Sequence, residues 1–310
     1  MRILAAGLAI ALGLGVASCS TEETNSASGN TDGELTVYAT TGYIADAVEN
    51  IAPDAEIITM VGPGGDPHTY QPSTKDTEAM NNADAVLWNG LHLEAQMIDQ
   101  LESFGDKQLA VGEEVDESLL LDWPETDDEG NELNDPHVWN SPEAWQQVVT
   151  AIGDKLGEID PDNAQTYKDN AKAYNDEIQA KHEELSDLMA NEVDEPRILI
   201  TGHDAFNYFG ETYDLEVRAT DFVSTEAALS ATELSELADY IAENKVPVIF
   251  QDNQANPQAI TSLQEAVESR GWEVEISSEE LYADSLGTEA PVDTYLGVLE
   301  HNATAVAEAL

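Results

Sequence analysis

The stretch DPDNAQTYKDNAKAYNDEIQAKHEELSDLMAN, residues Asp160–Asn191, decides the fold that we predict for this chain. Small or apolar side chains recur along it in steps of three, four or seven, at Ala164, Tyr167, Ala171, Tyr174, Ile178, Leu185 and Leu188. This spacing keeps one face of a helix apolar. Lys181 falls on the same face, where its stem can cover apolar surface while its charge stays in water.

Both ends of this helix carry recognisable signals. Asp160 is a candidate N-cap, Pro161 suits the first helical position, and Asp162 favours the positive first turn. Pro196 stops the helix because the residue before a proline is disfavoured in the helical region. About thirty residues rising roughly 1.5 Å each give a rod of about 45 Å, long enough to run along two lobes. We therefore expect residues 160–195 to link two lobes.

Alternating strand and helix patterns lie on both sides of the rod and predict α/β lobes with parallel sheets. In the first lobe, residues 34–159, the expected strands are Leu35–Thr40, Glu56–Val61, Ala83–Trp88 and Gln108–Val111, and the expected helices are Tyr43–Ile51, Thr74–Asn82, Leu93–Leu101 and Pro142–Glu158. In the second lobe, residues 196–310, the expected strands are Arg197–Ile200, Leu215–Ala219, Val246–Phe250 and Trp272–Ile276, and the expected helices are Ala231–Glu243, Pro257–Ser269 and Val292–Leu310. Asp116–Asp135 is predicted to be an acidic loop.

The N-terminus has the pattern of a secretion signal. Residues 1–18 carry one basic residue and then an apolar run of the length of a signal h-region, which is short for a membrane span. The run ends in VASC, which resembles the lipobox of bacterial lipoproteins and implies a lipid on Cys19; the alternative is an ordinary signal peptide with an incidental cysteine. Residues 19–33 contain almost no apolar side chains and are predicted to form a flexible tether. Cys19 is the only cysteine, so an intrachain disulfide and a cysteine zinc cluster are both excluded.

The charge of the chain is extreme, with 11 Lys and Arg against 63 Asp and Glu and a net charge of −52. Nucleic acid is therefore excluded as an expected partner, because no basic surface could neutralise phosphates. Such a charge repels itself unless salt screens it. We interpret it as an adaptation to high salt, with a generally acidic surface as the alternative. Neither interpretation indicates the function.

Three of the six histidines stand out by their position. His68 follows a strand and a glycine-rich turn, His203 directly follows a strand, and His137 lies in a loop bracketed by prolines. Ligands of open α/β sheets gather beyond the carboxyl ends of strands, so these imidazoles could converge on one metal ion between the lobes. Satisfied loop histidines are an equally good explanation from position alone. Surface or packing roles suit the others, His92, His182 and His301, better.

Several motifs, in order along nearly the whole mature chain, resemble those of the zinc/manganese solute-binding lipoproteins of bacterial ABC importers. They are GGDPHTYQPS (64–73), NGLHLE (89–94), NDPHVWNSP (134–142), TGHDAFNYFG (201–210), LYADSLG (281–287) and DTYLGVLEHN (293–302). The resemblance implies two Rossmann-like lobes joined by one long rigid α-helix, with the metal held between them. Carried over by motif, the metal ligands would be His68, His137, His203 and Asp284. Asp252 lies where relatives often carry Glu and is expected near the site at most.

The resemblance also implies a function. A monomer on the outer face of the cell membrane, held there by its lipid anchor, would capture Zn²⁺, with Mn²⁺ as the alternative, and deliver it to an ABC permease and its ATPase. It would not be an enzyme. The acidic loop 116–135 departs from many zinc-type relatives because it contains no histidine. We interpret it as a solvated loop.

Two other classes of function compete with metal capture. A zinc hydrolase could use His and Asp ligands, but catalytic zinc keeps an open position for water, and neither an HExxH nor a nucleophile motif occurs. A surface adhesion or scaffold lipoprotein is the other alternative, and failure to bind metal tightly would favour it.

Overall fold

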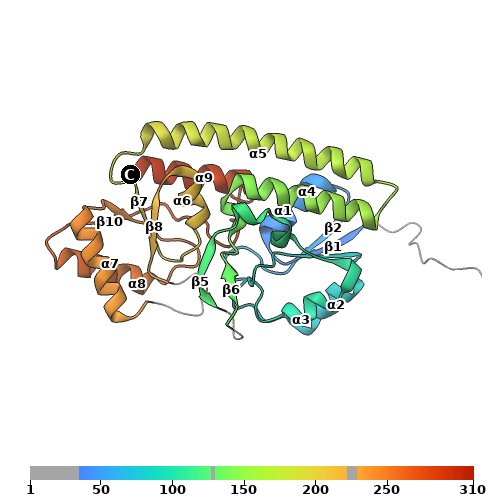
Figure 1. The fold of residues 1–310 in the computed structure, drawn as a ribbon, viewed down its shortest axis with the longest axis horizontal. Coiled ribbons are helices and arrows are strands. Elements are labelled where there is room, and N and C mark those ends of the chain that lie inside the picture. The colour runs from blue at the N-terminus through green and yellow to red at the C-terminus, as the bar shows by residue number, and fades with distance from the viewer. Residues whose placement is uncertain (1–34, 127–129, 222–228) are drawn as a thin grey trace, which may run out of the picture. The chain divides into compact units, whose positions relative to one another are not determined.

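The computed structural model describes residues 35–126, 130–221 and 229–310. It confirms an α/β fold in which parallel sheets lie in two lobes and a long helix runs past both (Figure 1). In the part of the chain that it describes, no helix combines the length and the apolar character needed to cross a membrane. The predicted signal peptide, the tether and Cys19 lie outside the described residues.

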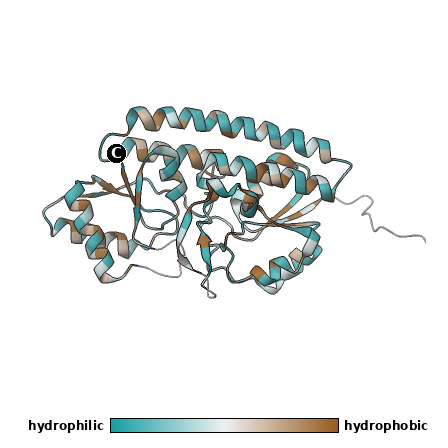
Figure 2. Ribbon diagram, in the orientation of Figure 1, coloured by the Kyte–Doolittle hydropathy of each residue, from teal (hydrophilic) through white to brown (hydrophobic). Residues whose placement is uncertain are grey.

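The N-terminal lobe is built on a four-stranded parallel sheet in the order β2-β1-β3-β4. Its strands are β1 (Thr36–Ala39), β2 (Glu56–Thr59), β3 (Ala85–Trp88) and β4 (Gln108–Ala110). Its helices are α1 (Gly42–Ile51), α2 (Thr74–Asn82), α3 (Ile98–Glu102) and α4 (Pro142–Ile159). Successive residues of β1 bury on opposite faces, Val37 in one apolar cluster and Tyr38 in another. Burial of both faces is typical of a parallel sheet covered by helices, and hydrophobic residues mark these strands in Figure 2.

The C-terminal lobe has two parallel strand pairs, β7 with β8 and β9 with β10. The strands are β7 (Ile198–Thr201), β8 (Glu216–Ala219), β9 (Val248–Ile249) and β10 (Glu275–Ile276). The helices are α6 (Asn207–Tyr213), α7 (Ala231–Asn244), α8 (Pro257–Glu268) and α9 (Tyr295–Ala309). The amide of Phe250 donates to the carbonyl of Ile200 at 2.8 Å and joins the two pairs. Helix α6 was not expected from the sequence.

The long helix is α5 (Ala164–Glu192), which packs against α4 of the first lobe and α9 of the second (Figure 1). The predicted start is wrong, because α4 extends to Ile159 and Asp160 forms the C-cap of that helix. The Asp160 carboxylate accepts hydrogen bonds from Asn163 and Tyr167, each at 2.8 Å, and so stabilises the turn between the two helices. The helix also ends at Glu192, four residues before Pro196.

Two other segments differ from the prediction. Of the expected helix 93–101, only the part from Ile98 onward is α-helical, in α3, which ends one residue later at Glu102. A left-handed turn with φ of 76°, 52° and 68° at Gly90, Leu91 and His92 precedes this segment. Glu94 stabilises that turn by accepting the amides of Asn89 and Gly90. The acidic loop contains an antiparallel pair, β5 (Asp122–Thr126) with β6 (Glu132–Asn134). The buried ring of Trp123, only 6% exposed, explains why this segment packs as a strand.

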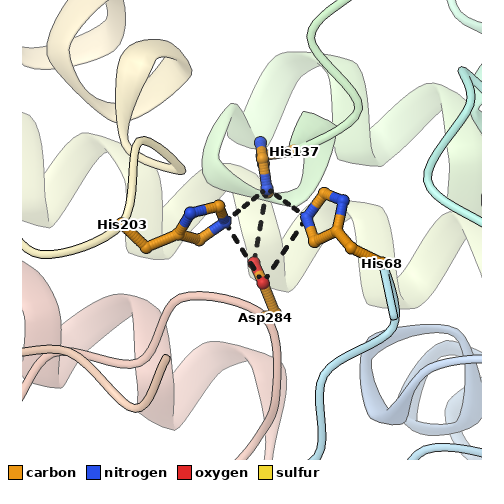
Figure 3. A group of neighbouring side chains, drawn as sticks. All are labelled: His68, His137, His203 and Asp284. Atoms are coloured by element: carbon orange, nitrogen blue, oxygen red, sulfur yellow. Dashed lines mark hydrogen bonds and ion pairs between the residues drawn. The ribbon is translucent and has the colours of Figure 1, made fainter. Parts of the chain in front are cut away.

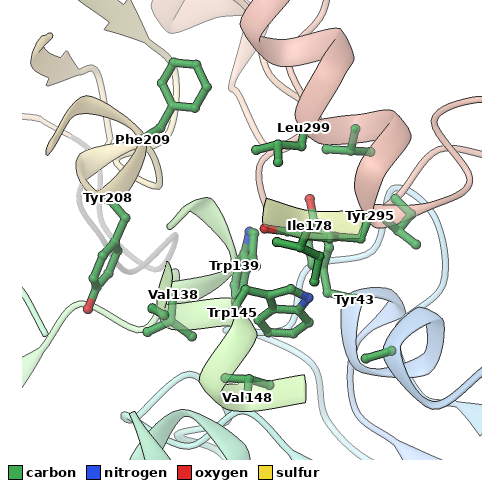
Figure 4. Close-up of a cluster of buried hydrophobic side chains, with 14 of the residues drawn as sticks. Tyr43, Val138, Trp139, Trp145, Val148, Ile178, Tyr208, Phe209, Tyr295 and Leu299 are labelled. Atoms are coloured by element: carbon green, nitrogen blue, oxygen red, sulfur yellow. The ribbon is translucent and has the colours of Figure 1, made fainter. Parts of the chain in front are cut away.

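The largest apolar cluster spans both lobes. Its aromatic centre combines Tyr43 of α1, Trp139, Trp145 of α4 and Tyr295 of α9, with Ile178 of α5 (Figure 4). The rings of Tyr43 and Trp139 stack at 5.0 Å, and those of Trp145 and Tyr295 lie 5.5 Å apart. Because one core unites α1, α4, α5 and α9, the two lobes are held together by apolar packing as well as by the chain.

Candidate metal-binding site

His68 is carried by the turn that follows β2. The turn Gly62–Asp66 bends the chain, and the Asp66 carboxylate accepts the amide of His68 at 2.9 Å. The residue is 3% exposed and points its Nε2 atom toward His137 and Asp284 (Figure 3). The local sequence thus sets the direction of this imidazole through an aspartate two residues before it.

His137 is held in the same way, and more firmly. The carboxylate of Asp135 accepts both the His137 amide at 2.9 Å and the His137 Nδ1 hydrogen at 2.7 Å. The second carboxylate oxygen of Asp135 accepts a hydrogen bond from the side-chain amide of Asn207 of α6 at 3.0 Å. The backbone carbonyl of Asp135 accepts one from the Tyr208 hydroxyl at 2.8 Å. A carboxylate on Nδ1 fixes the tautomer and leaves Nε2 free for a metal ion.

His203 follows β7 at the carboxyl end of the strand. One oxygen of Asp252 accepts the amides of Gly202 and His203, each at 2.9 Å, and the other accepts the amide of Gln254 at 3.0 Å. Asp252 is itself 3% exposed and lies outside the group whose ligand atoms converge. It therefore holds the backbone of the His203 loop, next to the site.

Asp284 lies on a loop of the C-terminal lobe that begins at the bridge between Asp252 and Leu281. The carbonyl before it, that of Ala283, accepts the Tyr43 hydroxyl at 3.1 Å and the Trp139 indole N–H at 2.8 Å. Both donors belong to the N-terminal lobe, so the aromatic core described above also positions the carboxylate.

Four buried side chains meet at one point (Figure 3). The ligand atoms of His68, His137, His203 and Asp284 all lie within 4.8 Å of one another. The His137 Nε2 atom is 3.2 Å from the Nε2 atoms of both other imidazoles, and Asp284 oxygens lie 3.3–3.6 Å from the three nitrogens. Ligand bonds of about 2.0–2.1 Å to a tetrahedral ion would place ligand atoms roughly 3.3–3.4 Å apart. The spacing fits a four-coordinate ion of the size of zinc.

The electrostatics of the group favour a cation. Within the described residues, both oxygens of Asp284 are buried without a hydrogen-bond partner. Burial would raise the pKa of Asp284, but His203 and His137 hold it well below its usual range, so this carboxylate is ionised. A buried charge is costly unless it is paired. Without metal, this carboxylate is paired by whichever of the three imidazoles, at 3.3–3.6 Å from its oxygens, carry a proton, and a metal ion between the four side chains would take their place.

The three imidazoles differ in proton affinity. Burial lowers the pKa of His68 to about 3. Burial also lowers the pKa of His137, but Asp135 and Asp284 outweigh burial and raise it to about 10. The pKa of His203 is likewise raised, because the attraction of Asp284 exceeds the cost of burial. Without metal, His137 therefore holds a proton at neutral pH and His68 does not, while His203 binds a proton more readily than an ordinary histidine.

Position along the sequence indicates the three histidines and the family resemblance adds Asp284, and the structure brings these four side chains together. It keeps the other histidines out of the group: His92 faces Trp123, His182 lies on α5 beside Tyr213, and His301 contacts the carbonyl of Glu280. The supporting residue Asp135 was not identified from the sequence. A signal was present, because Asp-Pro-His occurs twice, at 66–68 and 135–137, each time with the aspartate accepting the histidine amide.

Comparison with known proteins places the chain among metal-binding proteins. Residues 37–309 match the family model described as "zinc-uptake complex component A periplasmic". The chain is 34% identical over 310 residues to the zinc-binding protein TroA of Treponema pallidum, covering 97% of each chain. It is 33% identical over 291 residues to the manganese-binding lipoprotein MntA of Bacillus subtilis, covering 93% of each. The solved structure of TroA superimposes with a TM-score of 0.83 over 89% of this chain and 99% of that one.

Proposed function

The chain belongs to the family of periplasmic A components of zinc-uptake complexes, and from this premise we propose that it captures one divalent metal ion outside the cytoplasm. It then hands the ion to the permease and ATPase of an ABC importer, which is the role of this family. The observation that carries the proposal is the convergence of three imidazoles and one carboxylate, all buried, within 4.8 Å. We propose His68, His137, His203 and Asp284 as the four ligands.

Metal analysis tests this assignment. Protein purified without added metal or chelator should contain close to one divalent ion per chain. His203→Ala should lose most of it, whereas His301→Ala, a histidine variant outside the group, should keep it. Full metal content in His203→Ala would remove that residue from the site, and a metal-free parent that takes up no zinc would refute the function.

We propose that zinc binds more tightly than manganese. Imidazole suits zinc, manganese prefers more oxygen ligands, and for a given set of ligands the affinity order places zinc higher. The relatives named above include a zinc-binding and a manganese-binding protein. Competition titrations with the two ions therefore test which of them this chain binds more tightly. His203→Glu should reduce the difference between the zinc and manganese affinities, because it supplies an oxygen ligand. Manganese outcompeting zinc in the parent would contradict the proposal.

We also propose that the site does no catalysis. Four protein ligands complete the coordination of a tetrahedral zinc ion. They leave no position for the bound water that a zinc hydrolase activates. Turnover of ester or peptide substrates by the zinc-loaded protein, abolished by chelation, would contradict this.

Anchoring is a separate proposal, supported by the VASC sequence and by relatives named as lipoproteins. Lipid on Cys19 would hold a monomer at the outer face of the cell membrane. Cys19→Ser should then release the protein from the membrane fraction or leave the precursor unprocessed. Fractionation and maturation like those of the parent would refute the anchor, and light scattering of the tether-free protein tests the monomer.

The domain division that we propose is residues 34–159 for the first lobe, 160–195 for the link and 196–310 for the second. Helix α5 packs on helices of both lobes and one apolar cluster spans them. Wide opening about a hinge would break this core, so release should proceed through small shifts of the ligand-bearing loops.

A further inference from the structure

The glycine turn that carries His68 is hydrogen-bonded to the opposite lobe. The amide of Gly64 donates to the hydroxyl of Ser285 at 2.9 Å. The side-chain amide of Gln254 donates to the carbonyl of the next residue, Gly65, at 2.8 Å. Two consecutive residues of the turn are thus held by side chains of the C-terminal lobe.

Ser285 directly follows the proposed ligand Asp284 and is 1% exposed. The side chain of Asn253 donates to its carbonyl at 2.9 Å and to its hydroxyl at 2.8 Å. The Ser285 hydroxyl therefore accepts one hydrogen bond from each lobe. It connects the turn before His68 with the loop that holds Asp284, whose carboxylate lies 3.6 Å from the His68 imidazole.

Packing alone does not hold the turn in place. Gly64 is exposed and has a φ of +72°, and a side chain added there would meet no atom within 4 Å. A cavity of about 350 Å³ lies beside the two loops and is lined by Gly62 and Pro63 from one and by Leu286 and Gly287 from the other. The turn is therefore not packed on all sides, and the hydrogen bonds of Ser285 and Gln254 restrain it.

We propose that Ser285 and Gln254 form a latch that keeps the His68 turn closed over the bound metal and limits the rate at which the metal leaves. Neither residue touches the ion, so both act as positioning residues. The inference rests on the proposed metal-binding function and adds to it the place where the site opens. His68 would be the ligand that leaves first, because its loop is the one that the latch restrains.

The test is the rate of zinc dissociation into excess chelator, followed by stopped-flow, for the full mature chain. Ser285→Ala removes the acceptor, and Gln254→Met removes the donor while keeping the length of the side chain. Each should release zinc about three- to tenfold faster, the effect expected for one hydrogen bond, and the double variant faster still. Ser277→Ala is the matched control, because its hydroxyl also makes two hydrogen bonds, both with Glu279.

A second measurement separates positioning from general destabilisation. Metal-free Ser285→Ala should melt at a lower temperature than the parent, because its buried hydroxyl accepts two hydrogen bonds, whereas metal-free Gln254→Met, which loses one partly buried donor, should melt close to the parent. Each variant should still bind one zinc ion. Dissociation at the parent rate in Ser285→Ala and Gln254→Met would overturn the latch, as would faster release in Ser285→Ala with the parent rate in Gln254→Met, because that pattern is the one expected from loss of stability alone. A parent that binds zinc stoichiometrically upholds the proposed function in either case, whereas a parent that binds none refutes both.

Discussion

Each imidazole of the site presents its Nε2 atom to the centre of the group, and in His137 the Nδ1 atom is committed to Asp135. The proton that Nε2 of His137 carries without metal is the one that an incoming ion must displace. At the proposed site, protons and metal ions therefore compete for the same lone pairs.

Acid should therefore unload the site. The metal-free form holds a proton on His137, whose pKa is raised to about 10, and His203, whose pKa is also raised, takes up a second proton as the pH falls, whereas a bound metal ion excludes both. Because protons bind only the metal-free form, lowering the pH favours that form, and zinc affinity should fall about tenfold per pH unit for each displaced proton. His68, with a pKa lowered to about 3, adds to the loss only in strong acid.

Zinc titrations between pH 5.5 and 8 in competition with an indicator check this slope. An apparent affinity that is constant over this range would contradict the assignment of imidazole ligands. The variant His301→Ala serves as the control, since its imidazole lies outside the group and the slope should not change.

At the level of single residues, the sequence predicted much of the candidate site. His68 and His203 follow strands and lie where the carboxyl ends of parallel strands bring ligands together. The choice of Asp284 among 63 acidic residues required the family motif, because nothing local distinguishes its carboxylate. Its position depends on Tyr43 and Trp139, which are 240 and 144 residues away from the Ala283 carbonyl that they hold.

Among the elements, α5 depends on one buried polar contact as well as on its apolar face. The Tyr174 hydroxyl donates to the Asp46 carboxylate of α1 at 2.5 Å, and the amide of Tyr295, at the start of α9, donates to the same carboxylate at 3.3 Å. Asp46 is 6% exposed, and burial raises its pKa to about 6. One side chain therefore joins helices from both lobes to the long helix.

Removing that hydroxyl should destabilise the fold. Tyr174→Phe leaves the buried Asp46 carboxylate with one donor fewer, and we expect it to lower the free energy of unfolding by about 1.5–3 kcal/mol, the range for a hydrogen bond to a charged group. Urea unfolding of the metal-free protein measures the loss. Tyr282→Phe, in a partly exposed ring, should change stability little, and equal effects of the two variants would contradict the role of Asp46.

The sequence predicted elements better than their ends. The apolar face of α5 was anticipated at Tyr167, Ala171, Tyr174 and Ile178, all buried. The start of α5 was not predicted correctly, because the sequence Asp160-Pro161 is equally compatible with a helix start and with the turn that ends α4. Helix α6 was missed because seven residues are too few to establish a helical period.

The whole molecule carries a net charge of −52, which its fold must accommodate. The Debye length shortens from about 10 Å at 0.1 M to about 3 Å at 1 M salt, so repulsion between surface carboxylates weakens greatly over that range. If the charge is an adaptation to high salt, the melting temperature of the metal-free protein should rise steeply with sodium chloride.

Differential scanning fluorimetry from 0.1 to 2 M sodium chloride checks this, with sucrose at equal osmolality as the uncharged control. A melting temperature indifferent to salt would contradict the adaptation. So would an equal rise in sucrose, because sucrose does not screen charge.

The indole of Trp139 donates to the carbonyl beside Asp284, and its ring lies 5.2 Å from that of His137. This contact makes the residue a built-in optical reporter, since the arrival of a cation changes the electric field at the indole. Zinc loading should alter the intrinsic emission of the protein, and Trp139→Phe should remove most of that change while Trp272→Phe, with its indole bonded to the distant Val246 carbonyl, should retain it. Loading could then be followed without a label and in the same cuvette that records the dissociation of the metal.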